Sequence, residues 1–341
     1  MFELKTYEEI GGSAWDEFVA STENGSIHQT SFWKSLQEKT PSRGAVLGFA
    51  AVLDGEIKAV MLCVRMRVPA YKIEWYYCGR GPVYEDFPAA KFLVESASAK
   101  LKEQTSGVFL RYDPYILSSD HPLLTNFKTV AAVQNYHPTD TIILNLENSI
   151  DELWNDLKKK RRYDIRKAQT NFNFKRISGN EATEKDIDDF YKLLTETTAR
   201  DKFSAHPKSY YADFLATLGE YVQLWFAEDK SGKRVATAIM TIWGDKAIYY
   251  FAAMSSDAEV RKLNPAHGLL WELIKFAESA GAKSFDLLGI APDNQPDHPY
   301  AGITKFKKAF GGEITSYKPG LEISLRPTKH RLYRLAKRVR Q

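Results

Sequence analysis

The sequence predicts a two-domain protein of the α/β (α+β) class, and three observations support this fold class. The chain has 341 residues, which is longer than a chain that folds around a single hydrophobic core usually is. Its hydrophobic content of 44% and aromatic content of 13% suit a well-packed globular protein. Helical and strand-like patterns also follow the same order in two halves, which we expect to be domains at 1–145 and 146–319.

In the first half, two helical patterns precede two apolar, β-rich runs that meet at Asp54-Gly55. This dipeptide favours a tight hairpin turn, so the runs on either side predict two strands. A strand, a helix and a second strand that ends at Asp113-Pro114 follow. The predicted helices are 7–22, 31–40 and 87–104, and the predicted strands are 45–53, 56–68, 73–84 and 107–115.

The second half repeats this order. Asn148-Ser149 can cap the first helix, Ser231-Gly232 and Gly244-Asp245 divide a three-strand meander, and Gly281 ends the helix that leads into the last strand. The predicted helices are 150–170, 184–200, 209–219 and 267–281, the meander is 221–255, and the last strand is 283–290.

The C-terminal segment, 320–341, predicts one more helix. Leu332, Leu335, Ala336 and Val339 form an apolar stripe with basic residues on its flanks. Such a helix can lie on a membrane surface or pack against another part of the chain. We expect it to pack back on the first domain.

A strand meander followed by strand–helix–strand is the order of acyltransferases of the GNAT type, so we expect two tandem GNAT-like domains. The usual phosphate loop of that fold is Gln/Arg-x-x-Gly-x-Gly/Ala before a helix, where free backbone amides hold a pyrophosphate. Residues 261–268 read RKLNPAHG instead, and Pro265 removes one amide. We therefore expect no acetyl-CoA binding, and a different acyl carrier.

The positive charge of the chain is local. There are 47 basic and 43 acidic residues, a formal net charge of +4, which does not suit indiscriminate nucleic-acid binding. Yet the segment LKKKRRYDIRKAQ at 157–169 is densely basic. On one helix Lys158, Arg161, Arg162 and Arg166 fall near one face, while Leu153, Trp154, Leu157 and Ile165 can face the core. A solvated surface and a phosphate partner both remain open from this pattern.

Metal, disulfide and export signals are absent from the sequence. Cys63 and Cys78 are the only cysteines, which favours a reducing compartment and core positions for both thiols. The N-terminal segment has neither the basic head nor the apolar core of a signal peptide. We expect a cytoplasmic protein without a metal.

Four stretches resemble one known family. LKKKRRYDIRKAQ resembles the signature of the Fem family of peptidoglycan interpeptide-bridge aminoacyltransferases, whose core is Lys/Arg-Tyr-x-Ile-Arg-Lys-Ala. In the same order, FLRYDPY at 109–115 resembles the family's strand before Asp-Pro. NPAHGLLWELIKFAESAGAKSFDLLGI resembles its helix–strand segment, and GITKFKKAFGGE at 302–313 its Phe-Lys-x-x-Phe-Gly-Gly ending. The resemblance implies two GNAT-like domains. It also implies a compact member without the long coiled-coil arm, because the helix candidates between 181 and 219 are short.

The resemblance implies a reaction that needs no cofactor. An aminoacyl group moves from aminoacyl-tRNA to an amine on the stem peptide of a peptidoglycan precursor, either nucleotide-linked or lipid-linked, at the inner face of the membrane. Attack of a neutral amine on an ester needs positioning, a proton path and charge stabilisation. Two alternatives remain: a GNAT-like acyltransferase with a polysaccharide or protein N-terminal acceptor, and a non-catalytic RNA-binding protein.

Two residues are candidates for catalysis. Lys307 matches the lysine of the family's Phe-Lys motif and could stabilise the oxyanion, although Lys305, Lys307 and Lys308 could equally be one solvated basic run. Asp113 ends a strand before Pro114 and could orient or deprotonate the incoming ammonium. Capping of the following turn is an equal alternative for Asp113.

The resemblance also implies binding residues. Tyr210 matches a tyrosine that binds the precursor, whereas His206 stands where a compact pattern has arginine, which puts a diphosphate contact there in doubt. Phe251 is expected to pack. The predicted precursor-binding residues are Lys34, His206, Tyr210 and Phe306. The predicted tRNA-binding residues are Lys158, Lys159, Lys160, Arg161, Arg162, Arg166 and Lys167.

Overall fold

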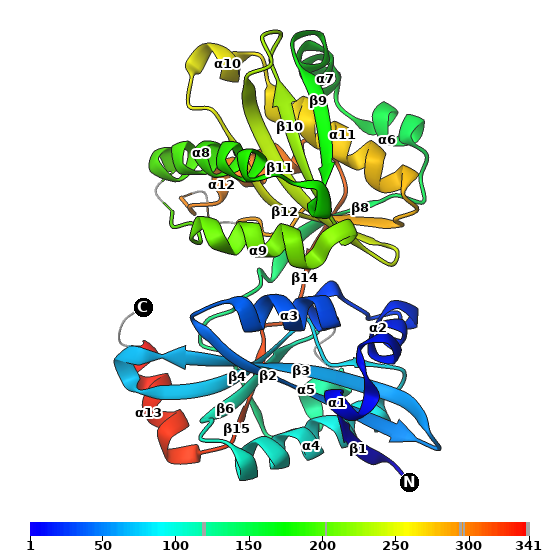
Figure 1. The fold of residues 1–341 in the computed structure, drawn as a ribbon, viewed down its shortest axis with the longest axis vertical. Coiled ribbons are helices and arrows are strands. Elements are labelled where there is room, and N and C mark those ends of the chain that lie inside the picture. Colours follow the sequence, from blue (N-terminus) through cyan, green and yellow to red (C-terminus); the bar gives the residue numbers. More distant parts are fainter. Residues whose placement is uncertain (118–120, 202, 293–294, 296, 339–341) are drawn as a thin grey trace. The chain divides into compact units, whose positions relative to one another are not determined.

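The computed structural model describes residues 1–117, 121–201, 203–292, 295 and 297–338. It divides into two compact units (Figure 1). Unit 1 is formed by residues 1–139 and 316–341, and unit 2 by residues 140–315. The end of the chain thus returns to the unit in which it began.

Unit 1 is built around one mixed sheet. Among its described residues the strand order is β1-β2-β3-β4-β6-β15-β7, and β5 pairs with β3. The pair β4 and β6 is parallel. The strands are β1 (Glu3–Thr6), β2 (Arg43–Leu53), β3 (Glu56–Val68), β4 (Ile73–Gly79), β5 (Val83–Tyr84), β6 (Phe109–Asp113), β7 (Thr129–Ala131) and β15 (Leu321–Ser324). The helices are α1 (Tyr7–Ile10), α2 (Gly12–Ser21), η1 (Ile27–Gln29), α3 (Ser31–Lys39), η2 (Pro69–Tyr71), α4 (Phe87–Gln104), α5 (Pro122–Thr125) and α13 (Pro327–Arg338).

Unit 2 has the same plan. Its sheet order is β14-β8-β13-β12-β11-β10-β9 in the described part of the chain, and β12 and β13 are the parallel pair. The strands are β8 (Asp140–Asn145), β9 (Asn173–Ser178), β10 (Val222–Glu228), β11 (Arg234–Trp243), β12 (Lys246–Met254), β13 (Ser284–Asp286) and β14 (Glu313–Ser316). The helices are α6 (Ile150–Asp156), α7 (Lys159–Asn171), η3 (Gly179–Glu181), α8 (Glu184–Asp201), α9 (Lys208–Leu218), η4 (Gly219–Tyr221), α10 (Ala258–Lys262), α11 (Pro265–Ser279) and α12 (Ala301–Lys308).

Each unit therefore contains an antiparallel meander, a long helix and a parallel strand. In unit 1 these are β2-β3-β4, α4 and β6, and in unit 2 they are β10-β11-β12, α11 and β13. The predicted α/β class and the predicted order of elements are confirmed. The longest helices among the described residues, α4 and α8, have 18 residues each, so this part of the chain holds no long helical arm.

The hairpin at Asp54-Gly55 forms as predicted. Both residues have positive φ, 53° and 87°, the backbone that a two-residue turn with the right twist requires. Leu53 and Glu56 then pair directly across the turn.

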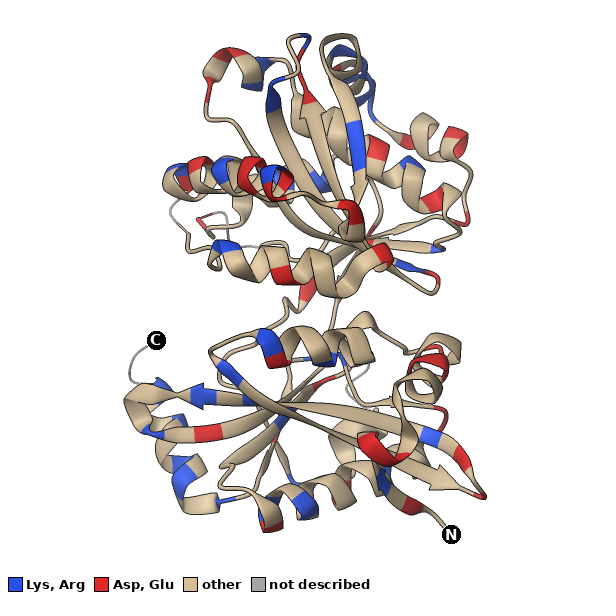
Figure 2. Ribbon diagram, viewed as in Figure 1, with Lys and Arg blue, Asp and Glu red and all other residues tan. Residues whose placement is uncertain are grey.

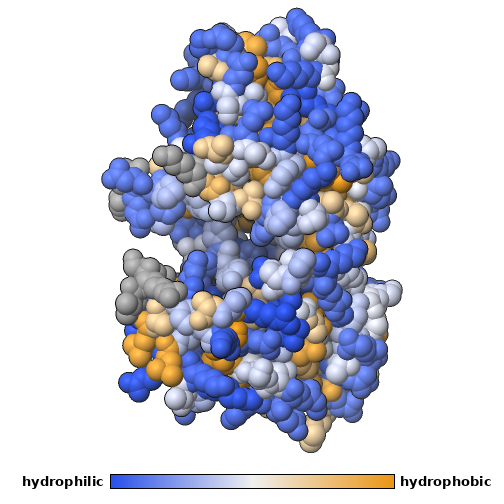
Figure 3. Space-filling view, turned by 60° about the vertical axis from the view of Figure 1, so that its left-hand side comes forward, coloured by the Kyte–Doolittle hydropathy of each residue, from blue (hydrophilic) through white to orange (hydrophobic). Residues whose placement is uncertain are grey.

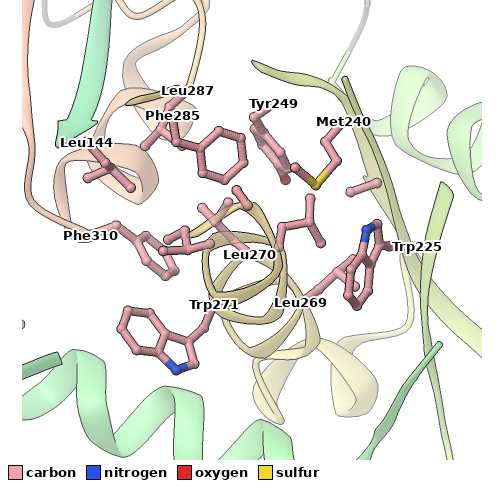
Figure 4. Packing of buried hydrophobic residues seen from close by; sticks show 14 of the residues in the cluster. Leu144, Trp225, Met240, Tyr249, Leu269, Leu270, Trp271, Phe285, Leu287 and Phe310 are labelled. Atoms are coloured by element: carbon pink, nitrogen blue, oxygen red, sulfur yellow. The ribbon is translucent and has the colours of Figure 1, made fainter. Parts of the chain in front are cut away.

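The core of unit 2 surrounds α11 (Figure 4). Leu269, Leu270 and Trp271 of this helix pack against Trp225, Met240, Tyr249 and Phe285 from successive strands. Each fully buried side chain of this kind contributes roughly 1.5–3 kcal/mol relative to an exposed one. Helix α7 lies beside α11, and α8 and α9 cover the other face of the sheet (Figure 1). On that face the ring of Tyr211 contacts that of Phe251. Phe251 thus has the packing role that we expected.

Two predicted boundaries are wrong. The helix expected at 150–170 is two helices, because Leu157 is buried in an extended conformation (φ −65°, ψ 137°) between α6 and α7. The basic residues all lie on α7 or at its N-cap, so the split separates them from Leu153 and Trp154, which belong to α6. The strand β8, which a boundary at 145 assigns to the first domain, pairs with β13 of unit 2.

Helix α13 packs on unit 1, but not through the predicted stripe. The rings of Tyr333 and Phe109 stack with centroids 5.2 Å apart, and His330 is also buried. Leu332 and Leu335 are instead 62% and 52% exposed, and hydrophobic surface is visible over α13 in Figure 3. Residues 339–341 of the predicted helix, with Val339, lie outside the described residues. Within the described residues, no helix is both long and apolar enough to span a membrane.

Candidate functional site

Lys307, near the end of α12, has an environment that differs from those of its basic neighbours. Its side chain is buried, and Nζ donates to the carbonyl oxygens of Leu288 (3.1 Å) and Gly289 (2.8 Å). Burial lowers the pKa of Lys307 to about 8, although the nearby Asp286 carboxylate raises it. Lys305 and Lys308 are exposed. The alternative of one uniformly solvated basic run is therefore wrong for Lys307.

The carbonyls that hold Lys307 belong to a constrained segment after β13. Leu288 has a positive φ of 56°, unusual for a residue with a large side chain. The Asp286 carboxylate accepts a hydrogen bond from the Leu288 N–H (2.7 Å) and another from the Thr141 hydroxyl. Helix α12 is tied to the same segment, because the Thr304 hydroxyl accepts from the Ala291 N–H (2.7 Å). Such a frame fixes the ammonium in one place.

Phe306, predicted to bind the precursor, is partly buried against the core of unit 2. Its ring lies 5.0 Å from that of His267 and 5.4 Å from that of Phe310. Nδ1 of His267 is buried and has no hydrogen-bond partner among the described residues. The contacts account for Phe306 as a packing residue, and its binding role stays a prediction.

Asp113 is buried in unit 1 at the end of β6 and accepts hydrogen bonds from three sides. Its Oδ1 accepts from the Arg80 N–H (2.7 Å). Its Oδ2 accepts from the Tyr77 hydroxyl (2.6 Å) and lies 2.9 Å from Nδ1 of His137. Buried His28 adds a second imidazole, whose ring centroid is 4.7 Å from that of His137.

These donors decide the charge of Asp113. Burial by itself raises the pKa of the carboxyl, but His137, Arg80 and the Tyr77 hydrogen bond together hold it below its ordinary value. A carboxylate that is charged and surrounded by donors orients its neighbours well and accepts a proton poorly. The geometry therefore favours orientation over deprotonation. It also differs from the turn cap that the sequence left open, because the Arg80 N–H that Asp113 accepts lies 33 residues earlier in the chain.

No local motif in the sequence marks the partners of Asp113. Tyr77, Arg80 and His137 lie 36, 33 and 24 residues away in the chain, and only the sheet and its loops bring them together. Arg80 has a positive φ of 51°, a strained conformation that proteins often keep near functional groups.

Of the three further predicted precursor-binding residues, Lys34 and Tyr210 are half-buried and His206 is exposed. Lys34 on α3 pairs with Glu38 (2.7 Å) and lies 5.0 Å from the centre of the Tyr7 ring. His206 is exposed just before α9, and its ring centroid is 4.2 Å from that of Tyr210. The structure thus brings His206 and Tyr210 together in unit 2. Lys34 belongs to unit 1.

Some residues of the basic segment contact other parts of unit 2, others are exposed, and Arg166 does both. Arg161 is turned inward, 3.4 Å from Asp164 and over the Phe310 ring. Arg162 donates to the Asn155 carbonyl (2.8 Å), and Arg166 lies over the Trp154 ring. Lys158 precedes α7 as its N-cap. The exposed residues are Lys158, Lys159, Lys160 and Arg166, and Lys167 is half-buried. Figure 2 shows in blue the Lys and Arg positions on the ribbon of α7. The expected common face of Arg161 and Arg166 is wrong.

The start of α11, where a GNAT phosphate loop would lie, is a weak anion site. Asn264 at the N-cap is left-handed (φ 60°) and makes no side-chain cap, and Pro265 begins the helix. The His267 and Gly268 amides already donate to the Asn264 carbonyl. No group of three or more metal-ligating side chains occurs among the residues that the structure describes, and Cys63 and Cys78 are buried thiols.

Comparisons with known proteins agree with this architecture. A family model described as "Acetyltransferase (GNAT) domain" matches residues 155–307. A UDP-N-acetylmuramoylpentapeptide-lysine N(6)-alanyltransferase of Weissella viridescens is 24% identical, over 87% of this chain and 88% of the relative. A Lipid II:glycine glycyltransferase of Staphylococcus haemolyticus is 22% identical, over 87% of each chain.

A solved structure has the same fold over almost the whole chain. The crystal structure of FemX superposes with a TM-score of 0.85 at 19% identity, and the match covers 97% of this chain and all of that one. The resemblance to the Fem family of peptidoglycan aminoacyltransferases is therefore confirmed, and the chain is an acyltransferase with two GNAT-like domains.

Proposed function

We propose that this protein transfers an amino acid from aminoacyl-tRNA to an amine of the stem peptide of a peptidoglycan precursor. The observation that carries the proposal is Lys307, a buried cation held by a constrained segment of unit 2. Relatives of the chain are named a glycyltransferase and an alanyltransferase. The names of the relatives include both a lipid-linked and a nucleotide-linked acceptor, so either form of precursor suits the proposal.

The chemistry of the transfer needs a cation more than it needs a nucleophile. The neutral amine attacks the ester carbonyl, a C–N bond forms, and the negative charge passes to the carbonyl oxygen. The intermediate then re-forms the carbonyl and breaks the bond to the ribose oxygen of the tRNA, which takes up the proton that the amine nitrogen releases and leaves as a hydroxyl. A fixed cation beside that oxygen stabilises the transition state more than the ground state.

The environment of Lys307 suits this role. An ammonium has three donors, and the Leu288 and Gly289 carbonyls occupy two of them. No acceptor for the third is found among the described residues, so it can donate to the developing oxyanion. With a pKa of about 8, the group is still mostly protonated at neutral pH.

In unit 1 we assign Asp113 an orienting role on the acceptor side, because its carboxylate is charged and already accepts from three groups. Lys34, His206, Tyr210 and Phe306 are proposed as further contacts to the precursor. Substitution of Asp113 by Asn should raise KM for the precursor and leave KM for charged tRNA unchanged. An unchanged precursor KM would count against this assignment.

Location follows from the substrates. We propose that the protein works in the cytoplasm at the inner face of the membrane, where the exposed Leu332 and Leu335 of α13 and the basic residues around them suit an anionic lipid surface. Co-sedimentation with anionic vesicles tests this. A Leu332→Ser, Leu335→Ser variant should lose the bound fraction, whereas Val130→Ser, at another exposed position of unit 1, should keep it.

Mass analysis of products tests the reaction itself. The protein is incubated with a pool of charged tRNAs and with each precursor, lipid-linked and nucleotide-linked, in separate reactions. The expected product is a precursor heavier by one amino-acid residue. Product formed from acetyl-CoA, or modification of a polysaccharide or protein N-terminus in place of the precursor, would overturn the assignment.

A further inference from the structure

Tyr163 lies in the middle of α7, yet its side chain is 63% exposed. Residues three and four positions away are its nearest neighbours on a helix surface. All four of these, Lys159, Lys160, Arg166 and Lys167, are basic. We call Tyr163 with these four residues the Tyr163 face.

The acidic residue of α7 does not weaken this face. Asp164 is buried and lies 3.4 Å from Arg161. Its carboxylate accepts a hydrogen bond from the side-chain amide of Asn264 (3.1 Å). Ile165 and Ala168 fix the same inward side of the helix in the core of unit 2. The Tyr163 face therefore carries four like charges around an exposed ring with no acid of its own helix among them. Such charges repel one another, so a polyanion that lies across them relieves a cost built into the folded chain.

We propose that the Tyr163 face binds a single-stranded segment of RNA, in which one unpaired base stacks on Tyr163 and the flanking phosphates contact the surrounding cations. An aromatic ring accepts the face of any unpaired base, and neighbouring lysines follow the backbone. This deepens the proposed function, on which the identification of the RNA as the donor tRNA rests. The face selects RNA by its unpaired bases, because the bases inside a duplex are stacked on both faces and cannot receive the Tyr163 ring.

The composition of the face favours RNA over a lipid surface. A helix that lies in a membrane interface buries several apolar side chains along one side. On α7 Tyr163 is the one large apolar residue that is exposed among the described residues, and its neighbours are all charged.

Binding of labelled RNA to the full-length protein tests the proposal. The probes are uncharged tRNA, a single-stranded RNA oligonucleotide and a blunt RNA duplex of equal length, each titrated at several salt concentrations. Tyr163→Leu removes the ring and keeps an apolar group, Tyr163→Phe keeps the ring, and Tyr300→Ala removes another exposed tyrosine of unit 2. Lys159→Ala with Lys160→Ala reports the phosphate contacts.

Stacking and charge give different signatures. Tyr163→Leu should weaken binding of tRNA and of the single strand by about 5- to 150-fold, the range that base–aromatic stacking carries, with the salt slope and duplex binding unchanged. Tyr163→Phe and Tyr300→Ala should bind as the wild type does. The double lysine variant should weaken all three probes and flatten the salt dependence.

Three outcomes would overturn the proposal. If Tyr163→Leu is folded and binds the single strand as tightly as the wild type, the stacking is wrong, while transfer from charged tRNA by the same preparations leaves the proposed function standing. If Tyr163→Leu loses duplex and single strand equally, the ring does not read unpaired bases. If the wild type binds anionic vesicles through Tyr163 but no RNA, the face is a lipid surface. If the same preparations also transfer no amino acid from charged tRNA, the proposed function is wrong as well.

Discussion

At the scale of the single residue, three lysines within four positions of α12 show that identical side chains can differ in exposure and in hydrogen-bond partners. Lys305 and Lys308 are exposed, whereas Lys307 is buried and bonded to two carbonyls. We expect Lys307→Met, which keeps the apolar stem and deletes the charge, to lower kcat about 10²- to 10³-fold, with KM for the precursor nearly unchanged. Single-turnover transfer from charged tRNA measures this.

The matched controls are Lys305→Met and Lys308→Met, which should retain turnover. The dependence on pH adds a second check. The cation is present below the pKa of about 8 and is lost above it, so the ratio of wild-type to Lys307→Met rates should fall as pH rises through 8. The ratio cancels the ionisation of the substrate amine. A folded Lys307→Met enzyme with normal turnover would exclude the role.

The functional role of a residue could be predicted from the sequence only where a local motif marks that residue. Lys307 was found through its Phe-Lys context, but its burial depends on the carbonyls of Leu288 and Gly289, which a left-handed residue turns toward it. The His137 and Tyr77 partners of Asp113 could not be found, because strand pairing and a distant loop bring them together. Long-range contacts of this kind leave no spacing in the chain.

At the scale of the element, a buried charge network joins β15 and α13 to each other and to β6 within unit 1. Glu322 lies between Arg111, His330 and Arg334, and its side chain is fully buried. Burial raises the pKa of Glu322, but the His330 hydrogen bond and Arg111 lower it more. Because the folded-state pKa is depressed, the network stabilises the fold above the unfolded-state pKa, and this contribution is lost as the pH falls through the folded-state value.

We expect Glu322→Gln to lower the free energy of unfolding by about 3–5 kcal/mol at neutral pH, since it leaves the buried Arg111 without its counter-charge. The difference between wild type and variant should shrink as the solution is acidified. Urea unfolding at several pH values measures it, with Glu95→Gln on the exposed side of α4 as the matched control. Equal stability of the two variants would mean that Glu322 contributes nothing net.

The start of α11 gives a second prediction for an element. The Asn264 side chain does not cap the helix, Pro265 has no N–H, and the His267 and Gly268 amides donate to the Asn264 carbonyl. Too few free amides remain to hold a pyrophosphate. Calorimetry should detect no saturable binding of acetyl-CoA, and an active acetyl-CoA-dependent GNAT enzyme in the same buffer is the positive control. Tight binding would show that other groups supply the missing contacts.

Elements with their own turn chemistry were predicted correctly, whereas breaks imposed by packing were not. The Asp54-Gly55 hairpin needs only its two residues and appears as expected. The break between α6 and α7 depends on Leu157, which is buried in an extended conformation. A helical pattern that continues through Leu157 gives no warning of that burial. The exposed Leu332 and Leu335 show the same limit, because an apolar stripe does not say which face of a helix the fold will cover.

At the scale of the whole molecule, the duplicated plan could be predicted from the sequence, because each half carries its own meander, helix and parallel strand. The return of the C-terminal segment to unit 1 was predicted, but as a helix over 320–341, whereas the segment begins with the strand β15. Strand β15 is short, yet it lies inside the sheet and pairs with β6 on one side and β7 on the other. A strand of only four residues is hard to distinguish from a loop by its sequence alone. The strand that completes unit 1 is therefore the last one in the chain.

This topology makes the two units unequal in a truncated chain. A protein that ends at residue 315 lacks β15 and α13, so β6 and β7 lose their shared partner and Arg111 becomes an unpaired buried charge. The loss of the ion pair alone costs about 3–5 kcal/mol, a large part of the total stability of an ordinary domain. We expect unit 1 to unfold in this chain and unit 2, whose residues 140–315 are all retained, to stay folded. Hydrogen exchange should show protection lost in 1–139 and kept in 140–315, and a co-expressed 316–341 segment should restore it. Protection of 1–139 in the truncated chain without that segment would mean that the sheet of unit 1 is stable without its C-terminal strand.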